Sequence, residues 1–319
     1  MSSEKDYDAL SGGNTLTKNQ VKNISASVRQ RLLNKSRTDA RPFQELAQYY
    51  AMERFLYRLA QSRHANRFVL KGALMLRIWQ APETRSTMDI DLLGKTDNDA
   101  SALISNIADI LSVDVDPDGL SFFPENITAE HITEDAEYQG VRILFPAKLD
   151  TMRLNIQIDI GFGDIIYPEP EKSEMPTILE FPAPQLLCYS RESSIAEKFE
   201  AMLKRRELNS RMKDFYDIWL LSRYFDFDGR ILSEAIRLTL EQRGTELPDD
   251  INIVAFSHEF IIEKQVQWNA FRKKLKHDHA PAEFENIVMQ VKAFINPIAS
   301  ALASRKPPPS KWNAPGPWT

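Results

Sequence analysis

Cysteine is nearly absent from this chain, which limits both its compartment and its chemistry. The 319 residues include a single cysteine, Cys188, and five histidines. One cysteine excludes an internal disulfide framework and indicates no selection for an oxidising compartment. No Cys/His cluster has the spacing of a metal site, and no Ser, His and Asp have the spacing of a hydrolase triad. Zinc modules and serine hydrolases are therefore disfavoured.

Long apolar runs and internal repeats are also lacking. We find no run that reaches the length of a membrane span, and the N-terminal residues are polar rather than signal-like. The expected location is therefore the cytoplasm. What remains is 43% apolar and 10% aromatic, enough for a core and for one large or two ordinary domains.

Charge is unevenly distributed along the chain, whose net charge is −5. Residues 1–87 carry 15 Lys and Arg against 7 acids, whereas residues 89–137 carry 13 acids against the single base Lys95. An RNA would be attracted to the first segment and repelled by the second. Two basic clusters are candidate RNA-binding surfaces, although each is also explained as a solvated helix face: Arg29, Arg31, Lys35, Arg37 and Arg41, and then Arg272, Lys273, Lys274 and Lys276.

Asp89-Ile90-Asp91 is the most informative motif. Side chains alternate along a strand, so Asp89 and Asp91 project together while Ile90 points into apolar packing. Two neighbouring carboxylates repel one another, and they favour a shared proton or a divalent cation such as Mg²⁺. The motif therefore predicts a metal site for phosphoryl transfer, with acids on a solvated strand face as the simpler alternative.

A second acidic strand is predicted near residues 154–160, where isoleucine and leucine alternate with polar residues. Asp159 faces away from the core in this pattern. If this strand lay beside the first, Asp159 would join the other two acids, and three carboxylates can hold two metal ions. The hairpin that precedes it is predicted to turn at Asp150-Thr151. The order of strands in the sheet is not readable from the sequence.

A glycine turn precedes the acids. Phe68-Val69-Leu70-Lys71-Gly72-Ala73 reads as a strand or helix end entering a turn, followed by an apolar helix. Glycine lets the backbone approach a phosphate, and amides at a helix start favour an anion. A helix-ending glycine would be the simpler explanation. At this distance from Asp89 and Asp91 we favour the phosphate interpretation.

A helix is predicted to begin near Ser194, where Ser194-Ile195-Ala196-Glu197 has the form of a capping box. Lys198 lies beside its apolar stripe and either covers apolar surface or contacts a triphosphate. Asp214 and Asp217 fall on one face of the next helix, where acids are also ordinary in a first turn.

The expected organisation has five parts. Residues 1–20 form a disordered tail, 21–165 the core with two N-terminal helices, 166–192 an extended proline-rich connector, 193–304 a helical domain and 305–319 a proline-rich disordered tail. The expected fold class is α+β: a mixed sheet of nucleotidyltransferase type, flanked by helices, with a mainly helical C-terminal part.

The chain resembles the AbiEii/AbiGii-type nucleotidyltransferase toxins from about Ser25 to Ala303. The resemblance is carried by several blocks in order: Ser27–Leu32, Phe68–Ala73, Arg85–Gly94, Gln157–Asp164, Ala196–Ala201 and Ser210–Asp217. It implies a Mg²⁺-NTP donor, an RNA acceptor that for some members is the 3′ end of tRNA, and a cognate antitoxin.

The same resemblance implies roles for individual residues. It assigns the metal to Asp89 and Asp91 and the triphosphate to Lys198. Our interpretation of the strands adds Asp159 as a third metal ligand. Asp214 completes the catalytic set, as base or as a residue that orients Lys198. The nucleotide-binding set is Lys71, Gly72, Ala73, Thr87, Lys198 and Asp217. One departure is Ala73, which replaces a glycine or serine common in the family and offers no hydroxyl to a phosphate.

Other functions remain open at this point. Asp-x-Asp also holds a metal in nucleotide-sugar glycosyltransferases, although the glycine turn and the lysine helix have no evident role there. A nucleotidyltransferase could also modify a small molecule or a protein. A non-catalytic nucleotide-binding scaffold is a further alternative, which Ala73 favours.

Overall fold

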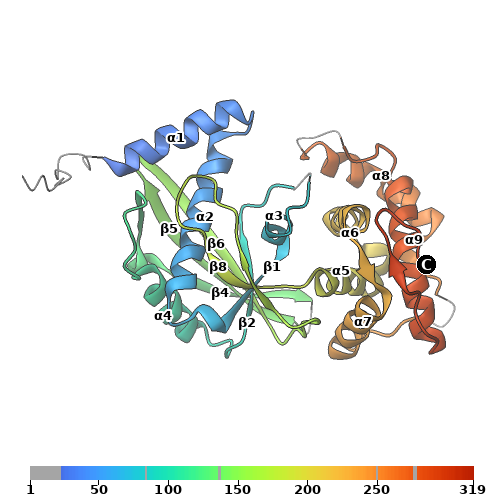
Figure 1. Ribbon diagram of the computed structural model, residues 1–319. Helices are drawn as coiled ribbons and strands as arrows, with labels where there is room; N and C mark the ends of the chain where they lie inside the picture. Colours follow the sequence, from blue (N-terminus) through green and yellow to red (C-terminus); the bar gives the residue numbers. More distant parts are fainter. Residues whose placement is uncertain (1–22, 83–84, 136–137, 249–250, 276–278) are drawn as a thin grey trace, which may run out of the picture.

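The computed structural model describes residues 23–82, 85–135, 138–248, 251–275 and 279–319. The predicted tail 1–20 and Lys276 lie outside these ranges. Two parts stand side by side in Figure 1, a sheet with helices packed against it and a group of helices that ends at the C-terminus. The predicted α+β class, with a mixed sheet and a mainly helical C-terminal part, is confirmed.

The sheet part begins with two helices, as predicted, α1 (Ile24–Thr38) and α2 (Phe43–Gln61). Its remaining elements are β1 (Phe68–Lys71), α3 (Met75–Ile78), β2 (Ile90–Gly94), α4 (Ala100–Leu111), β3 (Leu120–Phe122), β4 (Thr128–Asp135), β5 (Tyr138–Leu149), β6 (Met152–Phe162), β7 (Glu171–Glu174) and β8 (Gln185–Cys188). Within the described ranges, the strand order is β3-β5-β6-β2-β1-β8-β7, and β4 also pairs with β5.

The pairing of the central strands mixes both directions. β1 and β2 are antiparallel, β2 and β6 are parallel, and β5 and β6 form an antiparallel hairpin. The hairpin turns at Asp150 and Thr151, as predicted, and Asp150 has a φ of +56°. Strands distant in sequence therefore become neighbours at the centre of the sheet.

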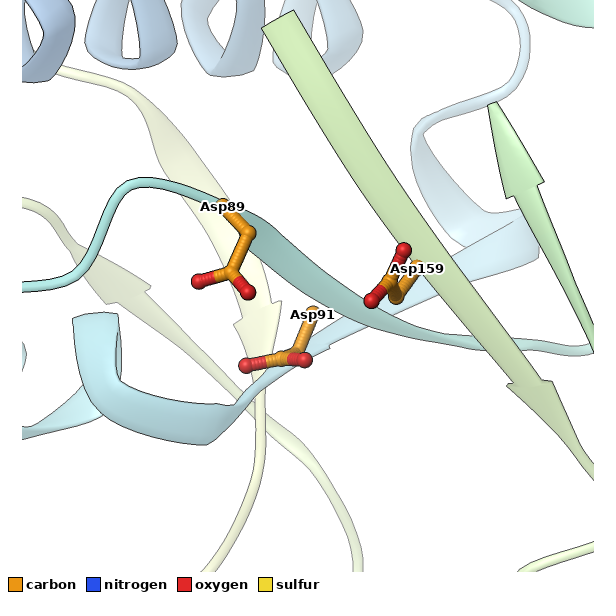
Figure 2. Close-up of side chains that lie close together, drawn as sticks. All are labelled: Asp89, Asp91 and Asp159. Carbon is orange, nitrogen blue, oxygen red and sulfur yellow. The ribbon is translucent and has the colours of Figure 1, made fainter. Parts of the chain in front are cut away.

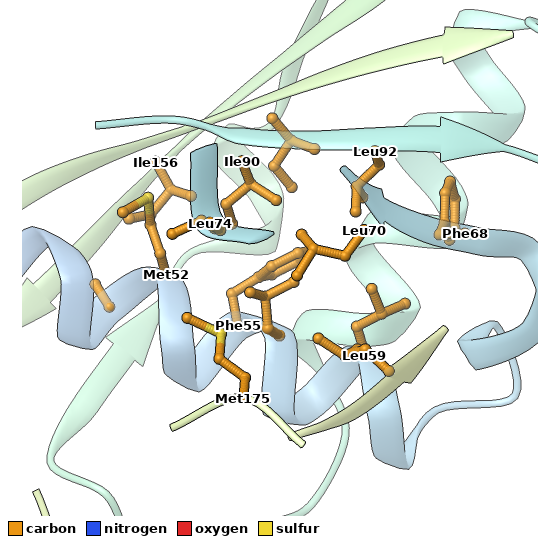
Figure 3. Close-up of a cluster of buried hydrophobic side chains, with 14 of the residues drawn as sticks. Met52, Phe55, Leu59, Phe68, Leu70, Leu74, Ile90, Leu92, Ile156 and Met175 are labelled. Atoms are coloured by element: carbon orange, nitrogen blue, oxygen red, sulfur yellow. The ribbon is translucent and has the colours of Figure 1, made fainter. Parts of the chain in front are cut away.

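One face of the sheet is buried against α2. Met52, Phe55 and Leu59 of the helix pack on the alternate apolar residues of β1, β2 and β6 (Figure 3), among them Ile90 and Ile156. This burial follows from the period of two in each strand, which places leucine and isoleucine on one side. The polar residues of the same strands are left on the opposite face.

The helical part contains α5 (Arg191–Arg205), α6 (Met212–Tyr224), α7 (Gly229–Arg243), α8 (His258–Arg272) and α9 (Phe284–Ser304), with the short strands β9 (Phe227–Asp228) and β10 (Lys311–Trp312). These helices bury a second apolar core of their own. Leu76 of α3 and Ala81 belong to this core, so the segment after β1 packs against the helices as well as the sheet.

Two predicted boundaries are wrong. Residues 166–192 are not a connector, because β7 and β8 extend the sheet and β8 pairs in parallel with β1. An extended segment has unpaired backbone groups, and the free edge of β1 supplies their partners. Helix α5 begins at Arg191 rather than near Ser194, because Ser190 caps it by accepting a hydrogen bond from the Ser193 amide at 3.0 Å.

The prediction of a disordered tail at 305–319 is also wrong. Trp312 is 2% exposed and its indole nitrogen donates to the Ser222 carbonyl at 2.6 Å. Trp318 stacks on Phe294 of α9, with ring centroids 5.5 Å apart. The prolines prevent a helix here, but three aromatic side chains provide enough apolar area to fold the segment onto α9.

Helix α9 corrects the expectation that no run reaches the length of a membrane span. Judged by length and composition alone, its 21 residues are long and apolar enough to cross a membrane. In the structure Phe284, Val291, Phe294 and Ile298 are fully buried against the other helices. The apolar face of α9 is therefore accounted for by the second core.

The packed tail gives the first testable prediction. Trp312→Ala should lower the free energy of unfolding by about 3–5 kcal/mol, because it removes a fully buried indole and one hydrogen bond. Lys311→Ala, which changes an exposed neighbour on the same strand, is the matched control. Urea unfolding followed by circular dichroism measures both. Equal stabilities of the two variants would mean that the tail does not contribute to the fold.

Candidate metal and nucleotide site

Three aspartates meet on the polar face of the sheet. Asp91 of β2 and Asp159 of β6 are register partners in parallel strands, and Asp89 immediately precedes β2. Figure 2 shows the three carboxylates directed into one space, and one oxygen from each lies within 4.8 Å of the others. The two acidic strands are therefore neighbours, which was the condition for Asp159 to join the other two acids. The geometry suits a divalent cation with oxygen ligands.

The electrostatics of this cluster disfavour three free charges. Burial, followed by the negative charge of Asp89, raises the pKa of Asp91 from 3.8 to about 6. A nearby cation would reverse this effect, because it favours the ionised carboxylate. The cluster is therefore arranged to bind positive charge.

Gly72 makes room for this carboxylate. Its φ is +73°, and a Cβ atom at this position would lie 2.6 Å from the carboxyl carbon of Asp91. Any larger residue would displace Asp91. The turn therefore requires glycine both for its positive φ and for the space beside Asp91. Ala73 is 3% exposed. Its methyl group therefore packs in the interior.

The loop before β2 is held by hydrogen bonds that orient Asp89. Thr87 donates its hydroxyl to the Asp89 carboxylate, and its amide donates to the Tyr49 hydroxyl at 3.1 Å. Gln48 donates to the carbonyls of Met88 and Asn155, at 3.2 and 2.9 Å. Thr87, which we predicted to contact the nucleotide, lies against the candidate metal ligand in this structure.

Asp159 has a partner that the sequence interpretation missed. Arg142 of β5 donates two hydrogen bonds to it, at 2.8 and 2.9 Å. The signal was present, because a hairpin that turns at Asp150-Thr151 places residue 142 opposite residue 159. Gln157 also donates to both oxygens, at 3.2 and 3.1 Å. A bound metal would take the place of this second donor, while Arg142 continues to hold the carboxylate.

Basic residues face the acids from the helical part and the preceding loop. Arg85 donates to both oxygens of Asp217, at 2.9 and 3.1 Å, and Lys198 lies 3.5 Å from the same carboxylate. Burial would raise the pKa of Asp217, but Arg85 and then Lys198 hold it below its usual value. Asp214 is 1% exposed, with Arg211 2.7 Å away. Lys198 therefore contacts Asp217, and the predicted partner Asp214 pairs with Arg211.

Lys71 lines a pocket with Asp91 and Asp159, and it also belongs to an ionic network that joins the two parts of the molecule. Its ammonium lies 2.7 Å from Asp164 and 2.9 Å from Glu197. Arg243 of α7 contacts Asp164 at 2.8 Å and Glu200 at 2.9 Å. Two cations and three carboxylates thus form a chain of ion pairs that links the sheet part to α5 and α7. The structure places Lys71 at this junction.

The first basic cluster lies on α1, except Arg41, which follows the helix and pairs with Glu45 at 2.7 Å. The guanidinium groups of Arg29 and Arg31 lie 5.5 Å from the ring centres of Phe43 and Phe181. Lys35 pairs with Asp39 at 3.2 Å. These contacts give each side chain a structural role beside the predicted RNA-binding one.

The second basic cluster divides at the end of α8. Arg272 donates to the Ala280 carbonyl at 3.0 Å, and Lys273 is exposed. Lys274 lines a pocket of about 490 Å³ that also includes Arg85 and Lys213. The structure thus brings Lys274 together with residues of the candidate site, and Arg85 and Lys213 are site residues that the sequence interpretation did not assign.

The chain is similar to one protein family and, more weakly, to solved structures. The family model described as nucleotidyl transferase AbiEii toxin, type IV TA system, matches residues 54–290. No curated protein matches the chain. Among solved structures, JHP933 from Helicobacter pylori has 14% identity and a TM-score of 0.47, over 82% of this chain and 94% of that one. A putative nucleotidyltransferase from H. pylori has 15% identity and a TM-score of 0.45, over 83% and 98%.

The raised pKa of Asp91 predicts a pH-dependent stability without added metal. An acid whose pKa is raised on folding stabilises the fold below its unfolded pKa of 3.8, and this stabilisation is lost as the pH rises through about 6. Above about pH 7, the free energy of unfolding of Asp91→Asn should therefore exceed that of wild type by about 1–3 kcal/mol. The two should converge toward pH 4.

Urea unfolding in EDTA at several pH values measures this difference, with Asp97→Asn as a control on an exposed acid of the same segment. A difference between wild type and Asp91→Asn that does not change with pH would contradict the assigned repulsion.

Proposed function

Because the chain belongs to the AbiEii nucleotidyl transferase toxin family of type IV toxin–antitoxin systems, we propose that it transfers a nucleoside monophosphate from a Mg²⁺-bound NTP to an RNA hydroxyl. The observation that carries the proposal is the cluster of Asp89, Asp91 and Asp159 on paired strands. An unpaired 3′ end is the acceptor we favour, and tRNA is the candidate that the family suggests. A nucleotide-sugar glycosyltransferase is disfavoured by the family membership.

Asp89, Asp91 and Asp159 would hold Mg²⁺. The fit rests on three hard oxygen donors within 4.8 Å and on the raised pKa of Asp91, first from burial and then from Asp89. When bound, the metal supplies charge neutralisation at the phosphates. Gly72, Thr87 and Arg142 position the three carboxylates, so they act through the ligands rather than on the substrate.

In the transfer step, the acceptor oxygen forms a bond to the α-phosphorus while the bond from that phosphorus to the β-bridging oxygen breaks. Pyrophosphate leaves, and the hydroxyl proton passes to solvent. Lys198 would balance the charge that builds on the pyrophosphate. Asp217, 3.5 Å away and itself held by Arg85, would orient Lys198. Asp214, buried against Arg211, would support the start of α6.

The family also suggests a partner and a location. We propose that a cognate antitoxin opposes the activity and that both act in the cytoplasm. We propose that a basic antitoxin would contact exposed acids of the segment that follows β2, such as Asp97, Glu125 and Glu130.

A direct assay tests the proposed reaction. The protein is incubated with Mg²⁺, each α-labelled NTP in turn and total bacterial RNA, and label in RNA is resolved on a denaturing gel. Label should enter a discrete RNA and disappear with EDTA. Label that enters only protein or a small molecule would overturn the RNA acceptor.

The metal ligands give a mutational prediction. Asp91→Ala should reduce transfer by at least roughly a thousandfold, because it removes a central ligand of the cation that supports phosphoryl transfer. The variant should remain folded, since the change relieves repulsion among the acids. Circular dichroism and the transfer assay are compared with Asp97→Ala, an exposed acid away from the site. Wild-type transfer by Asp91→Ala would refute the catalytic assignment.

Lys198 gives a second prediction. Lys198→Met keeps the aliphatic stem, which covers apolar surface, and removes the charge. We expect kcat to fall by roughly a hundredfold or more with little change in stability, because a charge on the leaving group matters most in the transition state. A variant that loses stability but keeps its activity per folded molecule would show that Lys198 is structural.

A further inference from the structure

A basic pocket lies beside the loop that leads to Asp89, and it has no role in the chemistry described so far. Its volume is about 490 Å³, and it is formed by the loop before β2, the start of α6 and the end of α8. The lining residues that matter below are Arg85, Arg211, Lys213, Gln267, Phe271 and Lys274. The volume is within the range of small-ligand sites.

The pocket is continuous in the chain with the loop that holds Asp89. Arg85 and Ser86 line it, and the next residue, Thr87, donates its hydroxyl to Asp89. On the other side, Lys213 belongs to the first turn of α6. The same helix carries Asp217, the partner of Arg85. A molecule bound here would therefore have one end beside the candidate metal ligands.

The charges of the pocket suit an anion. Four of its side chains are basic, and among the described lining residues none is acidic. Arg85 and Arg211 are paired from behind with Asp217 and Asp214, and Lys213 and Lys274 are exposed at the opening. Phe271 adds an aromatic surface, since it is half-buried and packs against Tyr216 and Trp268.

The distribution of charge separates the two substrates. The triphosphate of the NTP belongs at the carboxylates, where the metal would be, and the rest of the NTP is an uncharged nucleoside. An uncharged group does not call for two exposed lysines, Lys213 and Lys274, at the opening. A chain of phosphodiesters does, because every nucleotide brings another negative charge.

Resting on the transfer reaction proposed above, we propose that this pocket binds the single-stranded 3′ end of a nucleic-acid acceptor. Lys213 and Lys274 contact its backbone phosphates, and Phe271 supports a terminal base, as aromatic side chains do for unpaired bases. Gln267, exposed on α8 beside them, is placed to contact that base or its sugar. The acceptor hydroxyl then points toward the aspartates.

The test compares charge reversals at neighbouring lysines of the full-length protein. Lys274→Glu changes the pocket, Lys273→Glu changes the adjacent exposed lysine that does not line it, and Lys306→Glu changes an exposed lysine at the end of α9. The probe is a fluorescein-labelled single-stranded RNA of about 12 nucleotides, within the usual site size of such proteins. Its binding is measured by anisotropy across a salt series, with Mg²⁺ and without NTP.

We expect Lys274→Glu to weaken RNA binding roughly tenfold at low salt and to flatten the slope of log affinity against log salt by about 0.7 for the lost contact. Lys273→Glu should have a smaller effect and Lys306→Glu none. Binding of NTP, followed by thermal stabilisation, should be unchanged in all three. The KM for RNA should rise in Lys274→Glu while kcat at saturating RNA is retained.

Three results would overturn the inference. Equal losses for Lys273→Glu and Lys274→Glu would indicate a diffuse basic surface, and weaker NTP binding with unchanged RNA binding would assign the pocket to the donor. An RNA that carries 4-thiouridine at its 3′ end should also crosslink to the α8 peptide that contains Phe271, and a crosslink confined to α1 would contradict the site.

The proposed reaction can fail separately. Wild type that binds RNA through Lys274 but transfers no label refutes the reaction and supports the pocket. Transfer of label to RNA that Lys274→Glu leaves unchanged in both KM and kcat would support the reaction and refute the pocket.

Discussion

Repulsion among three carboxylates is the constraint around which the site is built. Parallel pairing of β2 and β6 places Asp91 directly beside Asp159, and the loop before β2 adds Asp89. The surroundings accommodate this charge in separate ways: Gly72 leaves space for one carboxylate, Thr87 donates to another, and Arg142 neutralises the third. Without them the acids would separate or take up protons, and either change would weaken cation binding.

The same constraint explains why two parts of the chain must meet. The sheet supplies the negative charge, and the helical part and the loop before β2 supply cations near it, among them Arg85 and Lys198. Asp217 holds both of these cations, so they remain ordered while no substrate is bound. The network around Lys71 and Arg243, which lies beside Asp91 and Asp159, joins the sheet to α5 and α7. The relative position of the acids and the cations therefore depends on buried ion pairs, which lose much of their value when one partner is removed.

Local patterns predicted the local features well. Alternation along residues 154–160 and the turn at Asp150-Thr151 determined which way Asp159 faces, and the same turn already implied Arg142 as its partner. Pairing between β2 and β6 was beyond such patterns, since the two strands are separated by α4 and three other strands. The tail at 305–319 was misjudged because proline content forbids a helix but does not forbid packing by Trp312 and Trp318.

Charge counting along the sequence was less informative than charge in space. The run Arg272–Lys274 reads as one basic cluster, yet Arg272 bonds to the backbone and Lys274 lines a pocket shared with Arg85. That pocket combines residues from three distant segments, and no window of sequence contains them. A substrate contacts the folded surface and not the linear sequence. The cations that matter for an acceptor are therefore those that the fold brings close to the aspartates. Where the basic residues lie relative to the metal ligands, more than how many there are, would determine how a bound nucleic acid is oriented in the site.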